Sequence, residues 1–242
     1  GVFNANSLLS INPNNYFVLD FENDIKNSGG STTTVTPGTL VYNSTYKKFN
    51  SYSLDTRFKS FIIPAGQDIL KFDNDDFTID FWHYDTEGKY TSDYRIYFSV
   101  NNSVNSGEFV FTPSNLLIVS GFGVDLSLAD PSLYIKVNTW NHIAIVRSNN
   151  NLSLYINGVN RVTQPITVSS NNYYDKGLHF GSSYWASSLH KRGYIDGFRI
   201  VKGTALFTGN FNSDSLVNPA DKLFLTQNYS GFKADTSLYG VN

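Results

Sequence analysis

Apolar and polar residues alternate with a period of two along several short stretches of the chain, which is the pattern of half-buried β-strands. The alternation is clearest at 77–81, directly after the turn formers Asp75 and Asp76. The further stretches that the sequence predicts as strands are 141–147, 152–156, 159–163, 177–181 and 194–201. No stretch has a convincing helical period, and 214–221 predicts one short turn at most.

The connections between the predicted strands are short and rich in Asn and Gly. The Asn-rich turn 149–151 separates two strands, and Asn157-Gly158, the dipeptide that best suits a two-residue type I′ turn, separates the next two. These three strands are therefore expected to form a β-meander. Many strands with such connections predict an all-β fold, a two-sheet antiparallel β-sandwich or jelly roll.

Composition supports this fold class and excludes several others. The 242 residues are 40% hydrophobic, 16% aromatic and 16% charged, which excludes disorder, a coiled coil and a long helical bundle. Cys is absent, so disulfides, thiolate metal sites and thiol nucleophiles are excluded. The net charge of −2 with scattered Lys and Arg argues against nucleic acid as a partner. The longest apolar stretch, 116–119, is too short for membrane insertion.

Six motifs in order along the chain carry a resemblance to a known family. They are YFVLDF at 16–21 with NSG at 27–29, KFNSYSL at 48–54, DDFTIDFW at 75–82, TWNHIAIVR at 139–147, LSLYING at 152–158 and GYIDGFRI at 193–200. Together they resemble the laminin-G-like branch of the concanavalin A-like lectin and glucanase superfamily, which implies a two-sheet jelly roll. The stretch 199–211 is most similar to the form that such modules take in bacteriophage virion proteins.

The resemblance covers 15–212 and implies a jelly-roll domain over that range. Residues 1–14 are then expected to be an N-terminal linker or arm, and 213–242 a C-terminal extension with a closing strand at 221–225. The implied function is that of a non-enzymatic module on a virion surface, as in a phage decoration, fibre or tail protein. Such a module would attach to cell-surface glycans or to other virion subunits, and a homo-oligomer is one form that it could take.

A concanavalin A-like glycoside hydrolase and a purely structural assembly domain without glycan binding remain as alternatives. Retaining glucanases of the superfamily carry an E-x-D-x-x-E motif, because their two carboxyl groups must lie about 5 Å apart. The chain has three glutamates, and its nearest approach to the motif, Glu22 and Asp24, has Asn27 at the position of the acid/base. The four histidines follow no metal or triad spacing, and His142 is expected to be an ordinary sheet residue. We therefore expect no enzymatic activity.

Sugar binding would need exposed aromatic side chains next to polar groups, and two segments offer them. The loop 181–192 carries an aromatic pair beside basic residues, and 84–94 is a second aromatic-rich segment. The candidate residues for glycan or partner binding are Tyr184, Trp185, His190, Arg192, Tyr84 and Tyr90. Trp185 has an equal alternative role in covering the edge of the sandwich or filling a groove of a neighbouring subunit. By their positions in the family motifs, Trp82 and Trp140 are expected to pack in the core.

Calcium is the one cofactor for which the chain has candidate ligands, since the resemblance implies such an ion on loops at one end of the sandwich. Counting by twos from Phe198 and Ile200 places Asp196 on their apolar face, where a buried carboxylate needs a partner. Two alternatives follow: Asp196 anchors a neighbouring loop through backbone N–H groups or an Arg, or it binds the metal ion. By resemblance, the further candidate ligands are Asp20, Glu22 and Asp24.

Overall fold

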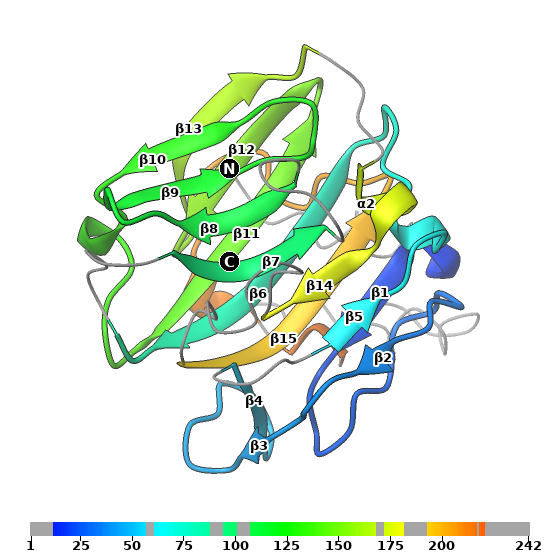
Figure 1. Ribbon diagram of the computed structural model, residues 1–242, viewed down its shortest axis with the longest axis vertical. Helices are drawn as coiled ribbons and strands as arrows, with labels where there is room; N and C mark the ends of the chain where they lie inside the picture. Colours follow the sequence, from blue (N-terminus) through cyan, green and yellow to red (C-terminus); the bar gives the residue numbers. More distant parts are fainter. Residues whose placement is uncertain are drawn as a thin grey trace.

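Two antiparallel β-sheets lie face to face in the computed structural model of the chain (Figure 1). The structure describes residues 12–56, 61–87, 94–100, 107–167, 172–181, 193–216 and 218–220. In this part of the chain the two sheets have eight and seven strands, and we call them sheet A and sheet B. The predicted all-β fold class and two-sheet antiparallel sandwich are thereby confirmed.

Sheet A runs in the order β13-β12-β11-β6-β15-β4-β3, and β1 also pairs with β15. Its strands are β1 Tyr16–Leu19, β3 Tyr42–Asn43, β4 Ser53–Asp55, β6 Phe77–Asp85, β11 Trp140–Ser148, β12 Asn151–Ile156, β13 Val159–Pro165 and β15 Gly193–Lys202. Sheet B runs in the order β10-β9-β8-β7-β14-β5-β2. Its strands are β2 Thr36–Pro37, β5 Phe61–Ile63, β7 Arg95–Val100, β8 Glu108–Phe111, β9 Leu116–Val119, β10 Leu126–Ala129 and β14 Leu178–Phe180.

The helical elements among the described residues are all short. They are the 3₁₀ turns η1 Pro13–Asn15, η2 Asp68–Leu70, η3 Pro131–Leu133 and η4 Ser213–Ser215, and the helix α2 Asn172–Lys176. The turn expected within 214–221 overlaps η4. Within the described ranges, no helix combines the length and the apolar character that crossing a membrane requires.

All six predicted strands are present, although β6 continues past the predicted end at Phe81 to Asp85. Strands β11, β12 and β13 pair in sequence order and form the predicted meander. Asn157 and Gly158 have φ angles of 52° and 75°, as the two central residues of a type I′ turn require. A Cβ atom at position 158 would also collide with the carbonyl oxygen of Phe211, so this turn needs glycine for two reasons.

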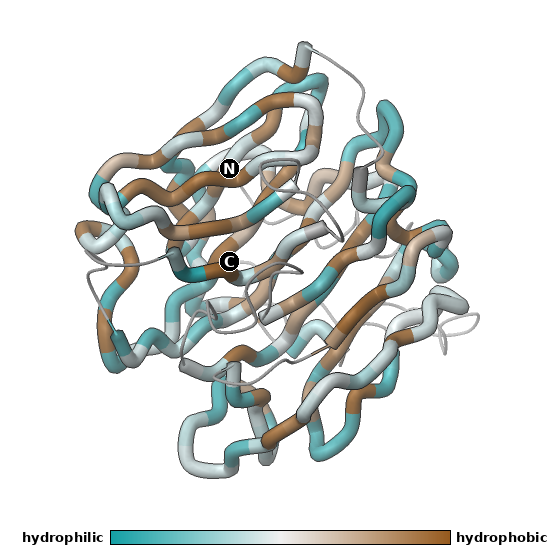
Figure 2. Tube along the Cα trace, viewed as in Figure 1, coloured by the Kyte–Doolittle hydropathy of each residue, from teal (hydrophilic) through white to brown (hydrophobic). Residues whose placement is uncertain are grey.

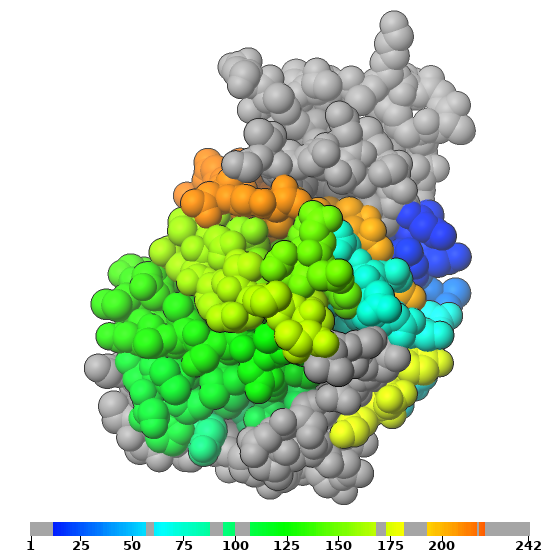
Figure 3. All heavy atoms as spheres, turned by 90° about the horizontal axis from the view of Figure 1, so that it is seen from above, coloured from blue at the N-terminus to red at the C-terminus, as the bar shows by residue number. Residues whose placement is uncertain are grey.

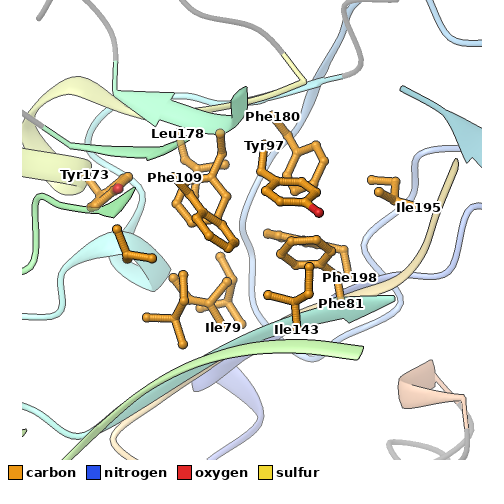
Figure 4. Close-up of a cluster of buried hydrophobic side chains, with 14 of the residues drawn as sticks. Ile79, Phe81, Tyr97, Phe109, Ile143, Tyr173, Leu178, Phe180, Ile195 and Phe198 are labelled. Carbon is orange, nitrogen blue, oxygen red and sulfur yellow. The ribbon is translucent and has the colours of Figure 1, made fainter. Parts of the chain in front are cut away.

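The main core lies between the two sheets and is strongly aromatic. Figure 4 shows Phe81 and Phe198 from sheet A facing Tyr97, Phe109 and Phe180, which come from sheet B. The ring of Phe81 lies 5.2 Å from that of Tyr97 and 5.4 Å from that of Phe180, both edge to face. Apolar residues alternate with more polar ones along many of the strands, as the colours of Figure 2 show. Period-two patterning therefore places one side of each sheet in this core.

The outer face of sheet A is buried as well, because the segment 203–216 crosses it. Figure 3 shows this segment in orange along one side of the sandwich. Its side chains Leu206, Phe207 and Leu216 pack in a second apolar cluster with Trp82 of β6 and other residues of the sheet. The backbone N–H of Leu206 donates to the hydroxyl of Thr78 at 2.9 Å. Since both faces of the central strands are covered, β6, β11 and β15 are buried along most of their length.

A β-bulge in β15 overturns one expectation about Asp196. The pairing of β15 with β6 shifts register between Asp196 and Arg199, and Gly197 inside the bulge has a φ of 58°. Ile195, Phe198 and Ile200 therefore all face the core between the sheets, while Asp196 faces outward. The prediction that Asp196 points to the same face as Phe198 and Ile200 was wrong, because side chains no longer alternate by twos across a bulge. The expected burial is correct, since Asp196 has 0% of its surface exposed.

Candidate functional site

Three aromatic side chains lie side by side on the outer face of sheet A, where β11, β6 and β15 come together at one end. In the strand register Trp140 lies opposite Tyr84, and Tyr84 lies opposite Tyr194. Paired residues of neighbouring antiparallel strands point to the same face, so the three side chains form a row. This face is the outer one, because Trp82 lies there two residues earlier in β6.

Tyr46 joins this row from the loop 44–52, which connects β3 to β4 at the bottom of Figure 1. Its ring stacks on that of Tyr194, with centroids 4.8 Å apart and planes 17° apart, and lies 4.8 Å from that of Tyr84. Tyr84 in turn contacts Trp140 at 5.7 Å. We call Tyr46, Tyr84, Trp140 and Tyr194 the aromatic platform. Tyr46 is 38% exposed, Tyr84 and Trp140 are half-buried and Tyr194 is 8% exposed.

Polar groups surround the aromatic platform. The indole Nε1 of Trp140 donates to the backbone oxygen of Lys47 at 3.1 Å, which fixes the ring against the loop. The side chain of Lys47 is exposed, whereas the ammonium group of Lys48 lies 3.6 Å from the ring centre of Trp82. Burial lowers the pKa of Lys48, although Asp214 and Asp196 oppose this shift. Exposed aromatic surface with hydroxyl and ammonium groups beside it can stack on an apolar ring face and hydrogen-bond its substituents.

The four acids predicted as calcium ligands bind backbone and hydroxyl groups of the protein. Oδ2 of Asp196 accepts the N–H groups of Lys48 and Phe49 at 3.0 and 2.9 Å, which is the loop-anchoring alternative. The carboxylate of Glu22 accepts the N–H groups of residues 51 and 52, Asp24 accepts that of residue 26, and Asp20 accepts a long 3.4 Å bond from the hydroxyl of residue 28.

Burial is the largest cause of the pKa shifts at two of these acids. It raises the pKa of Asp20, and it raises that of Asp196 to about 7 even though the bonds from Phe49 and Lys48 oppose the shift. In the part of the chain that the structure describes, no group of three or more His, Cys, Asp or Glu side chains is arranged to hold a metal ion. Calcium at Asp196, Glu22 and the neighbouring acids stays a prediction.

Of the residues predicted to bind glycans or partners, Tyr84 belongs to the aromatic platform. The other five, Tyr90, Tyr184, Trp185, His190 and Arg192, lie outside the described residues. The expected core role of Trp82 is confirmed, because its side chain is buried in the outer cluster. The expected core role of Trp140 was partly wrong, since this residue begins β11 at the end of the sheet and its side chain is only half-buried. The position of Trp140 at the end of a predicted strand is a signal that could have indicated a role in the site.

Tyr46 and Tyr194 were not predicted from the sequence as site residues. A buried charged cluster on the same face of sheet A was not predicted either. In this cluster Asp80 accepts two bonds from Arg199, at 2.8 and 2.7 Å, and Nε2 of His142 lies 3.0 Å from the same carboxylate. Burial alone would raise the pKa of Asp80, but Arg199 and His142 together hold it below its ordinary value. The rings of Phe207 and Phe211 lie 5.7 and 5.6 Å from that of His142 and cover it. Since all three polar residues are buried, the cluster serves the fold.

His142 gives stability a testable pH dependence. Burial lowers the pKa of His142, so the unfolded chain takes up this proton more readily than the folded protein. The neutral imidazole therefore favours folding above its ordinary pKa of about 6.5, and this contribution is lost as pH falls below that value. We expect this group to lower the free energy of unfolding between pH 7 and pH 5 by at most about 1.4 kcal/mol per pH unit, whereas the raised pKa of Asp196 acts in the opposite direction over the same range.

Urea titrations of the wild type and of His142→Gln across that pH range check this expectation. The glutamine amide can still donate to Asp80 but does not titrate. Asp196 titrates in both proteins, so on acidification the free energy of unfolding of the wild type should fall relative to that of the variant. An equal change in the two proteins would contradict the expectation.

The fold and the aromatic platform define a two-sheet jelly roll with an exposed aromatic surface at one end. Residues 60–206 match the model of the concanavalin A-like lectin/glucanases superfamily, and the chain belongs to this superfamily. The resemblance of the sequence motifs to the superfamily is thus confirmed. A comparison with curated protein sequences gave no match.

Several solved structures share this fold at low sequence identity. The binding domain of Paraclostridial mosquitocidal protein 1 is 19% identical, with a TM-score of 0.58 over 92% of this chain and 53% of that chain. Domain 4 of AbnA, a GH43 extracellular arabinanase from Geobacillus stearothermophilus in complex with arabinotriose, is 18% identical, with a TM-score of 0.55 over 87% and 97%. The receptor binding domain of botulinum neurotoxin D is 16% identical, with a TM-score of 0.56 over 89% and 53%. The chain thus spans about half the length of the two toxin domains.

Proposed function

We propose that the chain is a non-enzymatic glycan-binding module and that the aromatic platform is its sugar-binding surface. The observation that carries this proposal is the row of Trp140, Tyr84 and Tyr194 with Tyr46 stacked on it at a strand end of a rigid sandwich. Tyr46 is exposed, and Tyr84 and Trp140 are half-buried. The arabinanase domain solved with arabinotriose supports a sugar as ligand. The two toxin binding domains support binding rather than catalysis as the use of this fold.

The placement of the glutamates supports a role without catalysis. Glu22 lies after β1 and binds loop 44–52, and Glu87 follows β6 and lies 3.4 Å from Arg95. Glu108 begins β8 in the other sheet and is buried. A retaining glycosidase needs two carboxyl groups about 5 Å apart at one accessible place, and these three residues come from three separate elements.

We further propose that this module is displayed on the surface of a virion, in a phage decoration, fibre or tail protein, where it attaches to cell-surface glycans or to other virion subunits. The support is the resemblance of 199–211 to bacteriophage modules. In the structure this stretch ends β15 and continues as the cover of sheet A. If the chain is instead a pure assembly domain, its partner should bury more than about 1,000 Å² of surface in total and include the aromatic platform.

A glycan array followed by calorimetric titration with the best ligand, and with arabinotriose as a defined probe, tests the proposed function. Tyr46→Ala and Trp140→Ala should each raise the dissociation constant at least about tenfold, because each removes a stacking surface. Tyr174→Ala is the matched control, since this half-buried tyrosine lies in α2, away from the β3–β4 loop in Figure 1, with Lys71 5.7 Å from its ring centre. It should bind like the wild type.

Two results would contradict the proposed site or function. A silent array together with no response to arabinotriose would reject glycan binding and favour the assembly role. Binding that survives Tyr46→Ala and Trp140→Ala but is abolished by Trp185→Ala would reject the aromatic platform and place the site in the predicted loop 181–192.

A further inference from the structure

The loop 44–52 is held by two carboxylates from distant parts of the chain. Asp196, in the bulge of β15, accepts the N–H groups of Lys48 and Phe49, at 3.0 and 2.9 Å. Glu22 accepts the N–H group of Ser51 with both oxygens, at 3.1 and 3.0 Å, and that of residue 52 at 3.4 Å. The second half of the loop is therefore fixed by acceptors that are not part of it.

Side-chain packing next to Asp196 also holds the loop 44–52 on sheet A. The ring of Phe49 lies against Gly197, where an added Cβ atom would come within 2.9 Å of it, and meets Trp82 edge to face at 6.3 Å. The ammonium group of Lys48 lies over the same Trp82, 3.6 Å from the ring centre. At this point the loop rests on the outer face of sheet A, where the bulge and its glycine leave room for Phe49.

The first half of the loop carries the exposed part of the aromatic platform. Tyr46 stacks on Tyr194, and the backbone oxygen of Lys47 accepts the indole N–H of Trp140. The anchor at Lys48 follows Tyr46 by two positions, so the chain between them spans about 7 Å at most. A shift of the anchor therefore acts close to Tyr46, whose own N–H and carbonyl groups are also bonded to Asn43 and Ser53.

We propose that Asp196 is a positioning residue for sugar binding: by holding Lys48 and Phe49 it sets the loop so that Tyr46 closes on Tyr194 and Trp140 keeps its bond to Lys47. Glu22 assists from the other end of the loop. The consequence for sugar rests on the proposed function, whereas the placement of the loop does not. Asp196 itself is fully buried and would not touch the ligand.

The test compares Asp196→Ala with the conservative Asp196→Asn. The asparagine keeps one oxygen that can accept both N–H groups, whereas alanine leaves both donors without an acceptor. In amide-correlation NMR spectra, the indole N–H signal of Trp140 and the amide signals of Lys48 and Phe49 should move in the alanine variant. In Asp196→Asn the indole signal should stay at its wild-type position. The dissociation constant for the best glycan should rise at least about tenfold for alanine and less than about threefold for asparagine.

Glu22→Ala provides a second variant that should fold readily, because Glu22 lies at the partly exposed edge of the structure. It should weaken binding by about threefold and shift the signals of residues 51 and 52. Thr78→Val is the matched control: its buried hydroxyl holds the backbone of the segment 203–216 on the same face of sheet A and does not contact the loop. It should leave the Trp140 signal and the dissociation constant unchanged.

Unchanged Trp140 signals in both Asp196→Ala and Glu22→Ala would overturn the positioning role whether or not sugar binds. A moved signal with wild-type affinity would equally overturn it. If the wild type binds no glycan, the proposed function fails, while a moved Trp140 signal that asparagine restores still assigns the placement of the loop to Asp196.

Discussion

Replacing Arg199 with methionine is expected to lower the free energy of unfolding by about 3–5 kcal/mol, because the change leaves the carboxylate of Asp80 buried without its cation. Arg199 donates to both oxygens of Asp80, at 2.8 and 2.7 Å, and both residues are nearly inaccessible to solvent. Methionine keeps much of the apolar volume of the arginine side chain, so the loss reports mainly on the missing charge. Denaturant unfolding of the two proteins at pH 7 measures it.

Arg147→Met is the control for this prediction. Arg147 is also buried in sheet A, but its guanidinium donates to the backbone oxygen of Asp73 and to the amide oxygen of Asn150, and neither partner is a carboxylate. Its loss should cost about 1–3 kcal/mol, the range for unsatisfied neutral groups. Equal losses in the two variants would show that Asp80 is not the residue that makes Arg199 necessary.

The strands could be predicted from the sequence because their signals are local. Alternation within 77–81 and the turn Asn157-Gly158 depend on neighbouring residues alone, and both are present in the structure. The bulge at Gly197 could not be predicted in this way. A glycine inside a strand often marks a bulge, but whether the register shifts there depends on how β15 pairs with β6. The predicted face of Asp196 was therefore wrong, although the prediction that its side chain is buried was correct.

The site was less predictable than the fold because its residues meet through strand register and loop placement. Tyr84 was predicted from the aromatic segment that follows Trp82. Trp140 and Tyr194 join it because β6 pairs with both β11 and β15, which no local pattern reveals. Tyr46 reaches the row through a loop whose anchor, Asp196, lies almost 150 residues further along the chain. Of the four acids predicted as calcium ligands, Asp196, Glu22 and Asp24 accept backbone N–H groups, and Asp20 accepts a hydroxyl.

Gly197→Ala is expected to lower the free energy of unfolding by about 2–4 kcal/mol, from two causes that add at one position. A φ of 58° is left-handed and costs a residue with a Cβ atom about 1–2 kcal/mol. The new Cβ atom would also lie 2.9 Å from the ring of Phe49 and 3.1 Å from Cδ of Pro219, so the loop on this face must shift. Because Phe49 is one of the two loop residues that Asp196 holds, the same substitution should also disturb the Trp140 indole signal.

Gly66→Ala separates the two causes. Gly66 has a φ of 78°, also left-handed, but an added Cβ atom would meet nothing within 4 Å. This control should therefore lose only the conformational cost, about 1–2 kcal/mol, and keep the wild-type signal of Trp140. Thermal or urea unfolding of both variants, together with their NMR spectra, measures the difference. If Gly197→Ala loses no more stability than Gly66→Ala, the bulge leaves room for a side chain, and close packing of Phe49 on Gly197 is not what holds the loop in place.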